Sequence, residues 1–206
     1  MTFAEITKDI SKFENNGCCY IDNVLSEDTR KLLMSLLAVD ELEALLEGNQ
    51  VEGSREVYNT LSLNCINQIL LEKIKEATQK TNLYSTYAFY RKYYKGQELA
   101  KHKDRPECEI SITICLSTSG TDQEWPIYLE NHGQGITYKG NVKPGDGVIY
   151  KGCELSHWRE PCNQKWVKQF FSHYSTNPEL EFDSAHKKNR EKFLVSSLVK
   201  TVLEQD

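Results

Sequence analysis

Six short β-rich segments lie between Tyr84 and Tyr174, and they constrain the fold more than any other feature of the sequence. They are rich in β-branched and aromatic residues, as strands usually are, and glycine and proline residues punctuate the chain between them. In chain order they read YSTYAFYRKYY, ISITICLS, WPIYLE, GITYKG, GVIYKG and KQFFSHY. Short strands that follow one another with turn signals between them predict a β-sandwich or a jelly roll.

The chain on both sides of this β-rich part carries apolar residues at helical spacing. They are Ile6, Ile10 and Phe13, then Leu32, Leu33, Leu36 and Leu37, then Leu63, Ile66, Leu70 and Ile74, and near the C-terminus Phe193, Leu194, Leu198, Val199, Val202 and Leu203. Ser26 is a good N-cap for the second of these stretches. Asp40 with Glu43 resembles a capping box, which predicts that another helix starts there.

A chain of 206 residues suits one domain with a continuous core. We expect an α+β protein with a mainly β core, in which helices from both ends of the chain flank a jelly roll. Within this single domain, 1–206, the predicted parts are helical support in 1–82, the β core in 83–176 and a helical tail in 177–206.

The composition excludes several classes of function. The 30 acidic and 25 basic residues give a net charge of -5, so no nucleic-acid partner is expected. No apolar run approaches the roughly 20 residues that span a bilayer, and the N-terminal MTFAEITKDISKF has no apolar signal region. Seven cysteines without a CxxC pattern make neither a disulfide framework nor a thiolate zinc site, which predicts reduced thiols and a cytoplasmic protein.

His102 and Asp104 stand one residue apart, directly before a segment in which every second residue is isoleucine or leucine. Side chains two apart on a strand point to the same face, so an extended chain here brings the imidazole and the carboxylate together. His157 follows a second turn and a second short strand. Two histidines and one carboxylate on one face form the ligand set of non-haem Fe(II) oxygenases, although a lone His-x-Asp also occurs as ordinary polar structure.

Two segments resemble a known family. YYKGQELAKHKD resembles the Tyr-x-x-Gly-(x5)-His-x-Asp segment of prolyl-4-hydroxylase-type 2-oxoglutarate and Fe(II)-dependent dioxygenases. KPGDGVIYKGCELSHWREP is similar to the strand of that family that precedes its second metal histidine. The resemblance covers roughly Tyr84 to Tyr174 and implies a double-stranded β-helix. It implies as metal ligands and catalytic residues His102, Asp104 and His157.

The resemblance also implies an activity. Fe(II), 2-oxoglutarate and O2, with ascorbate as an optional reductant, would hydroxylate a C–H bond and release succinate and CO2. The expected substrate is a protein side chain, with peptidyl proline favoured, or an amino acid, because fold likeness does not transfer a substrate. The nucleic-acid demethylases of this superfamily carry two arginines spaced by five residues after the second histidine, whereas here Arg159 is followed by no arginine before Arg190.

In this family a lysine or arginine on the strand after the second histidine holds the far carboxylate of 2-oxoglutarate. Lys165 is the first candidate, Arg159 the second and Lys168 the third, and each of them could instead be a solvated surface cation. Tyr93 matches the family tyrosine whose hydroxyl reaches the co-substrate, and a core aromatic residue is the alternative for it.

Other possibilities remain open from the sequence. Arg105 could pair with Glu107 or Glu109, or could face the substrate. A non-catalytic β-helix that binds metal without turnover is the rival from another class. A zinc hydrolase is disfavoured, because no spare glutamate near either ligand segment stands in a general-base position, and Glu160 is expected to turn outward. His132 and His173 have no partners at metal-ligand spacing, and His173 is expected to be structural.

Overall fold

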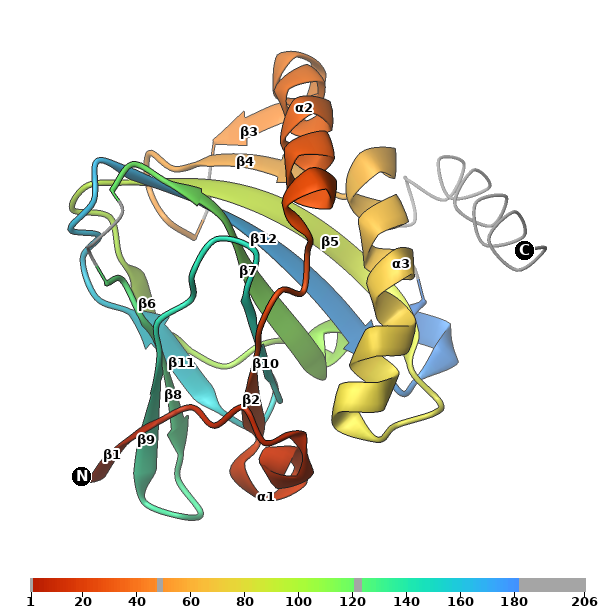
Figure 1. Cartoon of the computed structure of the whole chain (residues 1–206), viewed down its shortest axis with the longest axis vertical. Coiled ribbons are helices and arrows are strands. Elements are labelled where there is room, and N and C mark those ends of the chain that lie inside the picture. The colour runs from red at the N-terminus through yellow and green to blue at the C-terminus, as the bar shows by residue number, and fades with distance from the viewer. Residues whose placement is uncertain (1, 48–49, 121–123, 182–206) are drawn as a thin grey trace.

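The computed structural model describes residues 2–47, 50–120 and 124–181, and it contains two β-sheets that face each other (Figure 1). The smaller sheet runs in the order β1 (Thr2–Glu5), β9 (Ile136–Gly140), β8 (Ile127–Asn131), β11 (Ser156–Arg159) and β6 (Leu99–His102). The larger sheet runs in the order β2 (Cys18–Ile21), β10 (Gly147–Tyr150), β7 (Ile110–Thr118), β12 (Trp166–Ser175), β5 (Tyr84–Tyr94), β4 (Arg55–Tyr58) and β3 (Leu45–Glu47).

Two long helices cover the outer face of the larger sheet (Figure 1). They are α2 (Glu27–Ala44) and α3 (Leu61–Thr78). The short helical turns are η1 (Ile10–Lys12), α1 (Phe13–Asn16), η2 (Pro106–Cys108) and η3 (Pro178–Leu180). Ser26 caps α2 as predicted, because its hydroxyl oxygen accepts a hydrogen bond from the Thr29 amide at 3.2 Å. No helix in the described part of the chain is both long and apolar enough to cross a bilayer.

Strand β7 is buried on both faces, and this determines what lies inside the sandwich. Its isoleucines pack with α2 and α3 in one apolar cluster. The alternate residues Ser111, Thr113 and Cys115 are equally buried but point between the two sheets. The period-2 pattern therefore does not separate a buried face from a solvated one. It separates an apolar face under the helices from a more polar face inside the barrel.

The turn before β10 fixes the strand that leads to His157. Gly145 has a backbone φ of +94°, which favours glycine. The next residue, Asp146, accepts hydrogen bonds from the Asn23 amide at 2.8 Å and from the Tyr20 hydroxyl at 2.7 Å. These bonds tie the turn to the segment around β2, which pairs with β10 in the larger sheet.

The N-terminal part differs from the helical support expected for 1–82, because it contributes four strands as well as α2 and α3. Residues 2–5 form β1, which pairs in parallel with β9 and carries Ile6 into the core. The predicted helix start at the Asp40–Glu43 capping box is wrong, because α2 continues through Asp40 to Ala44. The Asp40 carboxylate instead accepts a hydrogen bond at 2.7 Å from the hydroxyl of Thr60, the N-cap residue of α3. Of the tail predicted for 177–206, the part beyond 181 lies outside the described residues.

Candidate metal centre

His102, Asp104 and His157 meet at one end of the sandwich. His102 ends β6 and lies directly opposite His157 of β11 in the strand register, with the ring centroids 4.2 Å apart. Nε2 of His102 lies 3.5 Å from Oδ1 of Asp104, and Nε2 of His157 lies 3.4 Å from the same oxygen. All three ligand atoms lie within 4.8 Å of one another. The three residues singled out from the sequence therefore converge on one point.

Asp104 lies beyond the end of β6, so a loop contact rather than strand pairing holds it in place. Its backbone amide donates to the carbonyl of Gly152 at 3.0 Å. A Cβ at position 152 would stand 2.4 Å from Oδ2 of Asp104 and 2.4 Å from the carbonyl oxygen of Cys108. Glycine is thus required at 152, because any side chain there would displace the carboxylate.

Backbone hydrogen bonds fix the orientation of both imidazoles. Nδ1 of His102 lies 2.8 Å from the carbonyl of Ala100, and Nδ1 of His157 lies 3.0 Å from the carbonyl of Leu155. A carbonyl only accepts, so Nδ1 of each ring donates to the backbone and Nε2 is the nitrogen left for a metal. In both rings Nε2 faces Asp104, which is the arrangement that a shared metal ion needs.

The Asp104 carboxylate is also oriented from behind. Oδ2 accepts a hydrogen bond from the Ser111 hydroxyl at 3.1 Å, and that hydroxyl lies 2.9 Å from Nδ1 of His173. Burial raises the pKa of Asp104, but its hydrogen bonds with His102 and His157 lower it more, so the net pKa lies well below the ordinary 3.8. The side chain is an anion. His173, expected to be structural, is the far member of this chain of contacts.

A second group of possible ligands shares the same carboxylate. Asp104, Cys108 and His173 also bring one ligand atom each within 4.8 Å. The Cys108 sulfur lies 3.1 Å from the Tyr87 hydroxyl, and burial raises the pKa of this thiol well above its ordinary value. A neutral thiol is a weak ligand, so the triad of His102, Asp104 and His157 is the better metal site.

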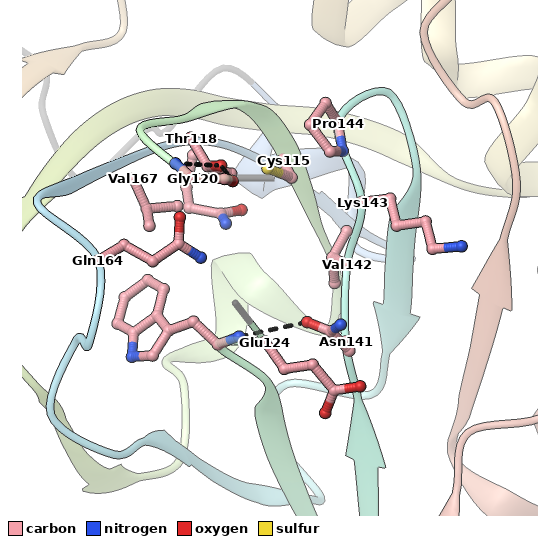
Figure 2. A pocket seen from close by; sticks show the side chains of 12 residues that line it. Cys115, Thr118, Gly120, Glu124, Asn141, Val142, Lys143, Pro144, Gln164 and Val167 are labelled. Atoms are coloured by element: carbon pink, nitrogen blue, oxygen red, sulfur yellow. Dashed lines mark hydrogen bonds between the residues drawn. The ribbon is translucent and has the colours of Figure 1, made fainter. Parts of the chain in front are cut away.

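A cavity of about 260 Å³ opens at the triad. Its lining residues are Gln50, Tyr87, Phe89, Arg91, Leu99, His102, Lys103, Asp104, Arg105, Cys108, Tyr150, His157, Phe171 and His173. A larger cavity of about 320 Å³ is shown in Figure 2. It is lined by Val167 and Gln169 of β12, whereas the cavity at the triad is lined by Phe171 and His173 farther along the same strand. Figure 2 shows Gln164 and Asn141 on opposite walls of the larger cavity. Among the described residues of its lining no set of metal ligands converges, so the smaller cavity is the candidate site.

Arg159 is the co-substrate candidate that points into the barrel. It is 1% exposed, and it donates to the carbonyl of Trp125 at 2.9 Å and to the Thr113 hydroxyl at 3.3 Å. Within the described part of the chain no carboxylate forms an ion pair with it, and its Nε has no hydrogen-bond partner. Burial lowers the pKa of the guanidinium. A buried cation without an acid is costly, which favours an anionic ligand beside it.

The other two basic candidates lie elsewhere. Lys165 is exposed in the loop before β12. The Nζ of Lys168 lies 6.0 Å from the ring centroid of Tyr90, which belongs to the apolar cluster under the helices. The residues of β12 that face the barrel interior near Lys165 are Val167 and Gln169, and both are uncharged. The geometry therefore does not favour Lys165 as the residue that holds 2-oxoglutarate.

Tyr93 and two residues that the sequence analysis missed form a network beside the metal site. Tyr93 is fully buried, and its hydroxyl accepts from Nη1 of Arg91 at 3.0 Å. Arg91 is paired with Glu56 and donates through Nη2 to the Gln50 side chain at 3.1 Å. The Gln50 amide nitrogen lies 3.0 Å from Nε2 of His102. Arg91 could have been found from its place two residues before Tyr93 on one strand face.

No protein-family model matches the chain, and no curated protein matches its sequence. Solved structures resemble its fold. An oxidoreductase of the 2OG-Fe(II) oxygenase family from Burkholderia pseudomallei has a TM-score of 0.67 over 85% of this chain and 96% of its own, at 9% identity. A prolyl-4-hydroxylase from Pseudomonas putida has 0.64 over 81% and 96%, at 13% identity. HygX from Streptomyces hygroscopicus, with nickel, 2-oxoglutarate and hygromycin B bound, has 0.63 over 81% and 85%, at 12% identity.

The chain thus has the fold of the 2-oxoglutarate and Fe(II)-dependent oxygenases. The predicted double-stranded β-helix is confirmed, and so is its mainly β composition with flanking helices in the described residues. At identities of this size the likeness is one of fold.

Proposed function

We propose that this protein is a 2-oxoglutarate-dependent Fe(II) dioxygenase that hydroxylates a C–H bond. The observation that carries the proposal is the convergence of two imidazole Nε2 atoms on one carboxylate oxygen, at 3.5 Å and 3.4 Å. This is the donor set of the two-histidine, one-carboxylate iron sites. The fold shared with 2-oxoglutarate and Fe(II) oxygenases supports the same assignment.

The donor set fits a ferrous ion on chemical grounds. Two neutral imidazoles and one carboxylate cancel one of its two charges and leave coordination positions open. When bound, the iron would couple the oxidative decarboxylation of 2-oxoglutarate by O2, which gives succinate and CO2, to hydroxylation of the substrate. The role of His102, Asp104 and His157 is to hold the ion, and the carbonyls of Ala100 and Leu155 keep the two rings in the ligating tautomer.

Arg159 is the residue that we assign to the far carboxylate of 2-oxoglutarate. It lies two residues beyond His157 on β11, inside the barrel, and no acid in the described residues neutralises it. Its contacts with Trp125 and Thr113 hold the guanidinium in place before any ligand arrives. Arg91 is a weaker candidate, because its ion pair with Glu56 and its bonds with Tyr93 and Gln50 already occupy it.

The substrate is less closely defined. The resemblance favours peptidyl proline or another protein side chain, and an amino acid is the alternative. Among proteins of similar fold, one is a prolyl-4-hydroxylase and another was solved with hygromycin B bound, so the fold does not decide the substrate. The net charge of -5 favours neither nucleic acid nor an acidic surface as partner. We also propose a cytoplasmic location, because the cysteine usage suits a reducing compartment.

The test is succinate formation from 2-oxoglutarate in the presence of Fe(II) and ascorbate, with and without pools of peptides and amino acids. We expect turnover that His157→Ala abolishes and that His132→Ala leaves unchanged, because His132 is an exposed histidine paired with Glu130 outside the triad. Metal binding without any succinate under all of these conditions would favour the non-catalytic binding module instead.

A further inference from the structure

The side chain of Gln50 reaches the metal site from the loop between β3 and β4. Its amide nitrogen lies 3.0 Å from Nε2 of His102, and this is the nitrogen of His102 that faces Asp104. Gln50 also lines the cavity of about 260 Å³ at the triad. Because a bond from an imidazole nitrogen to a metal is only about 2 Å long, the Gln50 amide would stand close to any ion that His102 holds.

Arg91 determines which end of the Gln50 amide faces His102. A guanidinium has donors only, so at its contact with Gln50 the amide oxygen accepts from Nη2, at 3.1 Å. The amide nitrogen is then the end that faces His102. The His102 ring agrees with this orientation, because Nδ1 donates to the carbonyl of Ala100 and leaves Nε2 as an acceptor. Gln50 therefore presents a hydrogen-bond donor to the metal site.

Arg91 is itself held in place on several sides. It is 3% exposed, it pairs with Glu56, and it donates through Nη1 to the Tyr93 hydroxyl at 3.0 Å. The pair with Glu56 neutralises its charge, so what Arg91 gives to Gln50 is orientation. A donor on the oxygen of an amide also polarises the amide, which strengthens the bonds that its N–H groups donate.

The residues that follow Gln50 anchor the loop to the rest of the fold. Val51 is 4% exposed and packs in the apolar cluster inside the barrel. The carbonyl of Glu52 accepts a hydrogen bond from the Gln97 side chain at 2.9 Å. Gln50 is thus an exposed residue whose side chain is tied to Arg91 and whose neighbours in sequence are fixed.

A metal at the triad would change the acceptor that the Gln50 amide needs. The metal would use the lone pair of Nε2 of His102, to which this amide donates. Asp104 is not the replacement, because its Oδ1 faces the two imidazoles and its Oδ2 accepts from Ser111. The acceptor that an oxygenase of this kind brings to the site is the carboxylate with which 2-oxoglutarate chelates the metal. Hydrogen bonds to an ionised carboxylate are among the stronger ones.

Resting on the oxygenase function proposed above, we propose that Gln50 binds the co-substrate, and that its amide donates to the carboxylate of 2-oxoglutarate that chelates the metal. Arg91 is the positioning residue that orients this amide. The two ends of 2-oxoglutarate are then recognised from the two sheets. The far carboxylate is assigned to Arg159 on β11 of the smaller sheet, and the chelating carboxylate contacts the loop between β3 and β4 of the larger one.

The test uses two ligands that separate the two ends. Oxalate keeps a chelating carboxylate and lacks the far end that 2-oxoglutarate carries. Isothermal titration of the full chain loaded with nickel measures the Kd of each ligand, and a separate titration measures nickel affinity. Gln50→Leu should weaken both ligands by about tenfold. Nickel affinity should stay unchanged or rise, because the variant removes an N–H that occupies Nε2 of His102. Arg159→Met should weaken 2-oxoglutarate and leave oxalate unchanged.

Gln50→Glu is the sharper variant, because it puts an acceptor where the donor stands with little change in shape. One carboxylate oxygen can still accept from Arg91, and the other would face the metal. Nickel affinity should rise, while oxalate and 2-oxoglutarate should bind more weakly than in Gln50→Leu, because two carboxylates repel each other. A purely structural role of Gln50 would not move the two affinities in opposite directions.

Gln97→Leu is the matched control. It removes another glutamine that contacts the same loop, through the carbonyl of Glu52, and it should leave the Kd of oxalate unchanged. An unchanged Kd for oxalate in Gln50→Leu, or an equal loss in Gln97→Leu, would overturn the role of Gln50. Binding of 2-oxoglutarate by the nickel-loaded wild type would still support the oxygenase function in that case. A wild type that binds no 2-oxoglutarate with nickel present would overturn both.

Discussion

The hydroxyl of Ser111 lies 3.1 Å from Oδ2 of Asp104, on the side of the carboxylate that faces away from the two ligand histidines. Ser111 belongs to the inner face of β7, so the rigid centre of the larger sheet orients a side chain that follows an edge strand of the smaller one. Hydrogen bonds of this kind to metal ligands influence metal affinity as well as orientation.

Ser111→Ala should weaken metal binding by about tenfold or more, because the carboxylate loses the bond that orients it. Titration with nickel or cobalt measures the effect. Ser172→Ala is the matched control: it removes another buried hydroxyl of the same sheet, which bonds to Asn67 at 2.7 Å on the helix side. The control should lower stability and leave metal affinity unchanged. Wild-type affinity in Ser111→Ala would contradict the orienting role.

Gly152→Ala should disrupt the metal site and destabilise the fold. The new Cβ would stand 2.4 Å from both Oδ2 of Asp104 and the carbonyl oxygen of Cys108, so the backbone must shift, at a cost of about 1–3 kcal/mol. Urea unfolding and metal titration measure the two effects. Gly133→Ala is the control, since its Cβ would meet Oδ1 of Asn131 at an ordinary 3.4 Å. If both variants behave alike, the close packing at 152 is not what holds Asp104.

Arg159→Met should separate stability from co-substrate binding. Removing a buried cation that has no acid partner in the described residues should leave the free energy of unfolding unchanged or raised. The KM for 2-oxoglutarate should rise by about 10- to 100-fold, because a charge-assisted hydrogen bond contributes roughly 1.5–3 kcal/mol. Lys165→Met, at an exposed position, should leave this KM unchanged. The opposite pattern in the two variants would make Lys165 the anchor.

Metal affinity should fall as the pH falls through the range in which His102 titrates. Burial lowers the pKa of His102, but its hydrogen bonds to Asp104 and to the carbonyl of Ala100 raise it more, so the net pKa lies above 6.5. A proton on Nε2 competes with the metal, and the loss should therefore begin at a higher pH than for an isolated imidazole. Nickel titrations between about pH 6 and pH 8 check this. A pH-independent affinity would mean that His102 does not bind the metal.

The sequence predicted the triad from the spacing of His102 and Asp104 and from the resemblance of the segment around His157 to a known family. His102 and Asp104 are two residues apart at the end of a strand, and a β core was expected to bring a later strand beside it. The structure supplies what the pattern could not: His157 stands opposite His102 in register, while Asp104 depends on a contact with Gly152. That contact joins residues from two different loops, and no periodic pattern in the sequence predicts it.

The residues around the triad were harder to predict for the same reason. Gln50 reaches His102 from the loop between β3 and β4, and its neighbours in sequence carry no regular pattern. Spacing could not rank Lys165 against Arg159, because the loop between β11 and β12 determines which residues of β12 face inward, and spacing in the sequence does not predict loop conformation. Of the N-terminal strands, β2 was expected from its sequence CCYI, but β1, β3 and β4 were missed, since β1 is a strand only because β9 offers it a partner.

Strand β1 closes the free edge of β9, so four residues at the start of the chain protect the smaller sheet. Without them, β9 would present a row of unpaired backbone amides and carbonyls, which is a template for pairing with another molecule. Removal of residues 2–5 would therefore promote self-association of the protein through the exposed edge of β9.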